Sequence, residues 1–254
     1  MNKKLTELIA LQKDKFEQEQ QIALQRTMED VLPEVIVNTI DIEECNEPLV
    51  RIVDYVPNVI IYFKEDRKVE GEDTLYARES VAEQLSEIAK DIAPLRLKVY
   101  DAFRPFEVQE RWYNRICNEI KANDSSLSLE QIQLKAFNFI FPPSLDPLKP
   151  AAHSTGGAID LTLTYDNGEE LDMGSEIRGF DCPAIITNAN CISEKQKDNR
   201  IMLIEAMTKR NFVNFPGEWW HFSMGDREWV AYLGLNKPAI YGGRENPYKT
   251  RSLA

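Results

Sequence analysis

Two short stretches of the sequence hold both of its histidines, each together with an acidic residue. In AAHSTGGAIDLTL, Asp160 follows His153 by seven residues, and in GEWWHFS, Glu218 precedes His221 by three. Together the stretches supply two imidazoles, one carboxylate and a spare carboxylate. That is the set of groups in a catalytic zinc site, in which three protein ligands hold the metal, water takes the fourth position and a nearby Glu accepts a proton.

The chain between His153 and Asp160 must bend if both side chains are to reach one metal ion. From Ala158 onward apolar and polar residues alternate, which predicts a strand with one apolar face and a polar face that carries Asp160. A straight strand would place residues seven apart on opposite faces. Gly156 and Gly157 permit the necessary bend. Taken singly, each stretch is more typical of an ordinary surface or core histidine than of a metal site.

A third stretch, VYDAFRPFEVQERW, places Arg104 directly before Pro105, after an expected strand over residues 96–103. The proline ring restricts the backbone of Arg104 to extended conformations. A guanidinium fixed in this way can stabilise the oxyanion that forms when a carbonyl is attacked. A salt bridge from Arg104 to Asp101 or Glu107 is the alternative interpretation.

The elements that must position these residues follow from hydrophobic spacing and from caps. Helical periodicity is expected over residues 1–31, before Pro33, and over 77–94. Capping boxes predict two further helices that begin after Ser128 and after Ser193. Strand-forming residues occupy 50–63, with a bend at Pro57. Since strands and helices alternate without a regular βαβ rhythm, the fold class is predicted to be α+β.

Composition limits the partners of the chain. Of its 254 residues, 30 are Lys or Arg and 42 are Asp or Glu, which gives a net charge of −12. Nucleic acids and anionic membranes are therefore unexpected partners, because both are bound by basic patches. Charged residues interrupt the apolar residues of the first twenty positions, and no run of 18 apolar residues occurs. We expect a cytoplasmic protein with reduced cysteines. The oligomeric state cannot be read from the sequence.

The three stretches, in this order, resemble the D-alanyl-D-alanine dipeptidases, zinc peptidases that include the vancomycin-resistance dipeptidases. The family pattern S-x-H-x-x-G-x-A-x-D, then E-x-W-H, preceded by Y-D-x-x-R-P, stands here as AAHSTGGAID, EWWH and YDAFRP. The segment LDMGSEIRGFD also looks like the family segment that follows the Asp ligand. The likeness runs from about residue 50 to 240. It suggests an N-terminal helical extension over 1–40 and a catalytic domain over 41–254.

The resemblance implies a role for each residue of the site. One zinc ion per chain would be bound by His153, Asp160 and His221. Glu218 would be the catalytic base, and Arg104 would stabilise the transition state. Asp181 looks like the acid that receives the free amino group of the substrate. The implied fold is the α+β fold of D,D-carboxypeptidases and the hedgehog signalling domain, with a central antiparallel sheet flanked by helices.

One position departs from the family pattern. Ala151 stands where the family has Ser, two residues before the first His ligand, and this side chain is expected near the polar groups of the substrate. The expected activity is zinc-dependent hydrolysis of D-Ala-D-Ala or a similar small dipeptide. The alternatives are a D,D-carboxypeptidase or L,D-endopeptidase that acts on peptidoglycan peptides, and a non-catalytic binding module stabilised by zinc.

Overall fold

A computed structural model of the protein describes residues 1–63, 74–137, 140–179 and 182–247. The helices of these ranges are α1 (Lys3–Leu11), α2 (Lys13–Ile22), α3 (Glu34–Val37), α4 (Glu79–Asp91), α5 (Phe106–Asn123), α6 (Leu129–Ala136), α7 (Glu194–Thr208) and α8 (Arg227–Tyr232). The strands are β1 (Leu49–Arg51), β2 (Ile60–Ile61), β3 (Tyr76–Arg78), β4 (Arg96–Asp101), β5 (Ala158–Thr164), β6 (Val213–Asn214) and β7 (His221–Ser223).

The central sheet has five strands in the order β2-β4-β5-β7-β6. Neighbouring strands are antiparallel except for β2, which pairs in parallel with β4 at one edge. A separate antiparallel pair is formed by β1 and β3. The α+β prediction with a central antiparallel sheet is confirmed, and the parallel edge strand is the one difference in this sheet.

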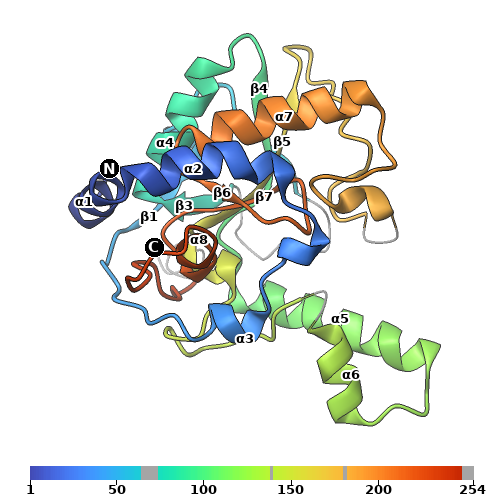
Figure 1. Ribbon diagram of the computed structural model, residues 1–254. Coiled ribbons are helices and arrows are strands. Elements are labelled where there is room, and N and C mark those ends of the chain that lie inside the picture. The colour runs from blue at the N-terminus through green and yellow to red at the C-terminus, as the bar shows by residue number, and fades with distance from the viewer. Residues whose placement is uncertain (64–73, 138–139, 180–181, 248–254) are drawn as a thin grey trace.

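One face of the sheet packs against helices. Figure 1 shows α2 and α7 side by side across the sheet, with α4 beside them. Their apolar residues form one core with the apolar face of β5, which consists of Ile159, Leu161 and Leu163. The helices α5, α6 and α3 lie on the other side of the molecule (Figure 1). Asp160, on the polar face of β5, lines one cavity together with Trp112 of α5 and Val37 of α3. None of the helices in the described ranges combines the length and hydropathy needed to cross a bilayer.

Most of the predicted elements are present. The helix expected over 77–94 is α4, and its apolar residues Val81, Leu85 and Ile88 are buried. Both predicted capping boxes form, at Ser128 before α6 and at Ser193 before α7. The strand material of 50–63 is divided, because a 3₁₀ turn at Ile52–Asp54 separates β1, which pairs with β3, from β2, which joins the central sheet.

The first forty residues contact the rest of the molecule extensively. Leu5, Leu8 and Phe16 belong to the same core as the central sheet. In the same segment, the buried Arg26 forms an ion pair of 2.6 Å with Glu19. Arg26 also donates a hydrogen bond to a carbonyl oxygen of α8. The domain boundary near residue 40 stays a prediction, but the two parts share one apolar core.

Candidate metal centre and active site

Sheet register places acidic and imidazole side chains next to one another on three adjacent strands. Asp101 of β4 pairs with Asp160 of β5, and Asp160 pairs with His221 of β7. Side chains of directly opposed residues lie on the same face of a sheet, about 4.5–5.5 Å apart at Cβ. A register irregularity between Val99 and Asp101 brings Asp101 opposite Asp160. The polar row across the strands is therefore produced by backbone pairing.

His153 reaches this row through the glycine turn that the sequence predicts. It lies in a 3₁₀ turn, Ala152–Thr155, which ends at Gly156 in the left-handed conformation (φ 75°). The backbone then enters β5, and His153 Nε2 lies 3.2 Å from Asp160 Oδ1. The backbone N–H of Arg104 donates to the carbonyl oxygen of His153, at 3.0 Å, which joins two of the three sequence motifs directly.

The predicted strand is present as β5, and its polar face is buried as well as its apolar one. All seven residues of β5 are buried. Asp160, on the polar face, is 2% exposed.

His153, Asp160 and His221 together form a group that fits a metal ion. One ligand atom from each residue lies within 4.8 Å of those from the other two, and all three residues are buried. His221 Nδ1 is 3.0 Å from Asp160 Oδ1, the same oxygen that faces His153. Burial lowers the pKa of His153, whereas the two imidazoles outweigh the effect of burial on Asp160 and hold its pKa well below the usual value.

The outer nitrogen of each imidazole is held by an acceptor. His153 Nδ1 donates to the carbonyl oxygen of Ala102 at 2.9 Å, and His221 Nε2 lies 3.1 Å from Glu228 Oε2. With protons on these outer nitrogens, the inner nitrogens are available to bind a cation beside the Asp160 carboxylate. Two nitrogens with a carboxylate oxygen are zinc donors.

Glu228 was not predicted from the sequence. It lies in the first turn of α8 and also accepts a hydrogen bond from Ser223 Oγ at 3.1 Å. Burial opposes its ionisation, but His221 outweighs burial and lowers the pKa of Glu228. Beside it, burial raises the pKa of Asp226 to about 7. An acid seven residues after His221 carries no recognisable spacing signal, because only the turn between β7 and α8 returns it to the ring.

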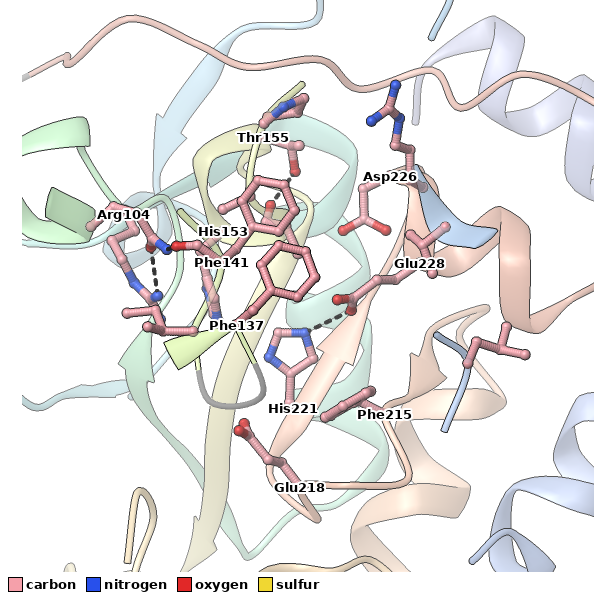
Figure 2. Close-up of a pocket in the computed structure, with 18 of the residues that line it drawn as sticks. Arg104, Phe137, Phe141, His153, Thr155, Phe215, Glu218, His221, Asp226 and Glu228 are labelled. Atoms are coloured by element: carbon pink, nitrogen blue, oxygen red, sulfur yellow. Dashed lines mark hydrogen bonds and ion pairs between the residues drawn. The ribbon is translucent and has the colours of Figure 1, made fainter. Parts of the chain in front are cut away.

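Glu218 lies in the turn between β6 and β7, three residues before His221. Figure 2 shows its carboxyl group on the opposite side of the His221 ring from Glu228. Burial raises the pKa of Glu218 to about 7, and Asp160 adds to that effect while His221 opposes it. A carboxyl group with a pKa near neutrality suits proton transfer, because it can both accept and return a proton.

Arg104 lines the same cavity and is held by several partners. Its Nε and Nη2 lie 2.8 and 2.7 Å from Asp101 Oδ2, and its Nη1 donates to Gln109 Oε1 at 2.8 Å. Its guanidinium carbon is 4.4 Å from the ring centre of Trp112. The salt bridge to Asp101 that was weighed as an alternative is thus present, and it orients the guanidinium at the pocket wall. Burial lowers the pKa of Arg104.

The cavity that unites these groups has a volume of about 940 Å³. Ala151 lines it and is 5% exposed, so its methyl group forms part of the wall. The side facing the histidines is apolar: Phe137 and Phe141 stand in front of His153 in Figure 2, and residues between Met28 and Asn38 complete the wall. Asp181, the residue implied to bind the substrate's amino group, lies outside the described residues.

A family model described as D-Ala-D-Ala dipeptidase matches residues 64–238. The chain belongs to the D-Ala-D-Ala dipeptidase family. Membership makes the protein a peptidase and confirms the resemblance inferred from the three motifs, all of which lie in the matched range. The first 63 residues, including the helices α1–α3, lie outside that range.

Other members of the D-Ala-D-Ala dipeptidase family match at moderate identity. A D-alanyl-D-alanine dipeptidase of Synechocystis sp. is 29% identical over 232 residues, which cover 80% of this chain and 94% of that protein. The D-alanyl-D-alanine dipeptidase of Escherichia coli is 29% identical over 135 residues, or 52% of this chain and 57% of that protein.

Two solved structures of vancomycin-resistance peptidases are more distant. A mutant of the D,D-pentapeptidase VanY in complex with Zn(II) has a TM-score of 0.39 at 14% identity, over 70% of this chain and 90% of that one. VanYB in complex with D-alanine-D-alanine has a TM-score of 0.40 at 14% identity, over 66% and 84%.

Proposed function

We propose that the protein is a zinc-dependent dipeptidase that hydrolyses D-Ala-D-Ala or a closely similar dipeptide. The observation that carries the proposal is the convergence of His153, Asp160 and His221 in one buried pocket of a chain from this family. These residues would hold the ion, one per chain. When bound, zinc supplies a Lewis acid that polarises a carbonyl group and lowers the pKa of water to about 7.

The proton transfers fall to Glu218. Its pKa of about 7 allows the carboxylate to take a proton from the attacking water and then return it to the leaving amine. The turn at Pro216–Gly217 and the buried Trp219 fix its position.

Arg104 is proposed to stabilise the negative charge that develops on the carbonyl oxygen. Its guanidinium is oriented by Asp101 and Gln109, so little reorganisation is needed when the charge appears. The side chain of Ala151 can offer no hydrogen bond to the substrate. We also propose Asp181 as the partner of the substrate's ammonium group, and a cytoplasmic location, on the sequence alone.

A second candidate is cleavage of a longer peptidoglycan peptide. It is favoured by the volume of the cavity, about 940 Å³, which lies at the upper end of the 300–1,000 Å³ usual for small-ligand pockets and exceeds what a dipeptide fills. The apolar wall in front of the ligands would then contact the additional residues.

One experiment separates these candidates. Elemental analysis of the purified protein is combined with an amino-acid release assay on D-Ala-D-Ala, L-Ala-D-Glu and a wall tripeptide. We expect about one zinc ion per chain, release of D-Ala from D-Ala-D-Ala, and loss of activity with a chelator that is reversed by zinc. Faster release from the tripeptide would favour the second candidate. A metal-loaded protein that hydrolyses none of the three would overturn both.

A further inference from the structure

Arg178 is a cavity residue that the proposed mechanism does not use. It lies in the chain between β5 and α7, and its side chain is 10% exposed. It lines the same cavity as Arg104, Asp160 and Glu218. Its backbone has φ 64°, a left-handed conformation that residues other than glycine seldom adopt. Arg178 is therefore a buried cation at the pocket wall, in a conformation that its surroundings impose.

The segment that carries Arg178 is fastened to the loop that carries Glu218. Ser175 Oγ donates to the carbonyl oxygen of Ala184 at 3.2 Å and accepts a hydrogen bond from Trp219 Nε1 at 2.9 Å. Ile177, beside Arg178, is 4% exposed. These contacts fix the guanidinium relative to the neighbouring catalytic groups.

The guanidinium of Arg178 is only partly satisfied by protein groups. Its Nη2 lies 3.0 Å from Asp101 Oδ2 and 3.5 Å from Asp160 Oδ2. Its Nη1 is buried and makes no hydrogen bond with any residue that the structure describes. A buried donor without an acceptor is costly, and a carboxylate is the acceptor that a guanidinium binds best.

A second guanidinium lies beside it. The guanidinium carbons of Arg178 and Arg104 are 4.3 and 4.4 Å from the ring centre of Trp112. Both cations approach the same oxygen of Asp101. One oxygen of Asp160 faces the two histidines, and the other lies 3.5 Å from Arg178 Nη2. Two fixed cations that approach the same oxygen of Asp101, one of them with a buried Nη1 that bonds to no described residue, favour an additional anion in the pocket.

We propose that Arg178 binds a carboxylate of the substrate, so that the enzyme requires a free carboxylate next to the scissile bond. This inference rests on the proposed function and narrows its substrate class. Because Arg178 lies 3.5 Å from an oxygen of the ligand Asp160, the bound carboxylate is close to the metal centre. The C-terminal residue of the substrate, whose amine is the leaving group, carries that carboxylate. It is either the terminal α-carboxylate of a dipeptide such as D-Ala-D-Ala or the side-chain carboxylate of an acidic second residue.

The test compares substrates with and without the carboxylate. Zinc-loaded wild type and Arg178→Gln are assayed on D-Ala-D-Ala and on its C-terminal amide, and then on D-Ala-D-Glu and D-Ala-D-Gln. For the α-carboxylate, Arg178→Gln raises KM for D-Ala-D-Ala about 10- to 100-fold and raises KM for the amide less than about threefold. For the side-chain carboxylate, the variant instead loses the wild-type preference for D-Ala-D-Glu over D-Ala-D-Gln. Arg178→Lys keeps the charge without the planar fork and falls between the two proteins.

Controls distinguish binding from support of the metal centre. Arg210→Gln removes the same charge at an exposed pair with Asp91 and leaves KM unchanged. Zinc content is measured for every variant. If Arg178→Gln loses zinc, or loses equally on all four substrates, Arg178 acts through Asp101 and Asp160 and the inference is overturned.

A direct binding measurement keeps this inference separate from the proposed function. Calorimetric titration of D-Ala-D-Ala and D-Ala-D-Glu into zinc-loaded Glu218→Ala is repeated with Arg178→Gln added. Weaker binding of either dipeptide in the double variant supports the carboxylate site, even if the wild type cleaves nothing. Absence of cleavage by the wild type would contradict the proposed function alone. Turnover by the wild type with binding that is independent of Arg178 would overturn the inference alone.

Discussion

Each imidazole of the metal centre is fixed from its outer side, and the two acceptors differ in kind. His153 uses the backbone carbonyl of Ala102, which no substitution of a side chain removes directly. His221 uses the carboxylate of Glu228, which is exchangeable. Glu218 lies on the opposite side of the His221 ring (Figure 2). Glu218 and Glu228 can therefore have separate roles: Glu218 transfers protons, and Glu228 orients the His221 ring.

Replacement of Glu218 tests proton transfer. Glu218→Ala should retain zinc, because the three ligand residues are untouched, and should lower kcat about 10²- to 10⁴-fold, the usual contribution of one general acid–base group. The measurement is steady-state hydrolysis of D-Ala-D-Ala together with zinc content. A variant with full zinc and a tenth of the wild-type kcat would remove Glu218 from the mechanism.

Replacement of Glu228 tests orientation. Glu228→Ala removes the acceptor on His221 Nε2, and zinc affinity should fall about 10- to 100-fold, as for other groups that orient metal-binding histidines. Glu228→Gln can still present an amide oxygen to the ring and should lose less. Competition with a zinc chelator gives the dissociation constants. Equal affinities for Glu228→Ala and the wild type would show that the ring is held without this carboxylate.

At the scale of elements, the site is a product of sheet register and one turn. The pairing of β4, β5 and β7 aligns Asp101, Asp160 and His221, and the left-handed turn at Gly156 returns His153 to them. The strand and the glycine bend could be predicted from alternation and from the HSTGG spacing. The contacts of Arg178 and Glu228 could not, because each depends on how a loop returns to the sheet, which no local periodicity encodes. The helix α5, which carries Trp112, also lacked a sequence prediction.

A matched pair of glycines tests the turn. A Cβ at Gly156 would overlap the side chain of Leu49, and its φ is 75°; Gly168 has φ 86° with nothing within 4 Å of an added Cβ. Gly168→Ala should lower the free energy of unfolding by about 1–2 kcal/mol, the cost of a left-handed residue alone. Gly156→Ala should cost more and should also weaken zinc binding, because His153 is displaced. Urea unfolding and chelator competition measure both. Equal costs and unchanged zinc affinity would contradict the role of this turn.

At the scale of the whole molecule, the N-terminal segment is not covered by the family model, but it packs against the rest of the fold. It supplies Leu5, Leu8 and Phe16 to the core and part of the cavity wall between Met28 and Asn38. Its helical character was predicted from its periodicity. Its docking was not, because loosely spaced leucines among Gln, Glu and Lys are equally compatible with a solvated arm. If the segment is part of the cooperative unit, its buried residues must contribute to global stability.

Two leucines of the same helix test whether the N-terminal segment contributes to global stability. In α1, Leu5 is fully buried and Leu11 is 74% exposed. Leu5→Ala should lower the free energy of unfolding by about 2–5 kcal/mol, because it removes buried methyl groups and leaves a cavity against the shared core. Leu11→Ala should change it by less than about 0.5 kcal/mol, as expected at an exposed position. Urea unfolding followed by tryptophan fluorescence reports on the sheet, since all four tryptophans lie outside α1. Leu5→Ala could instead unfold α1 while the fluorescence midpoint stays at the wild-type value. In that case the segment is an independent arm, and its part of the cavity wall is not bound to the catalytic core.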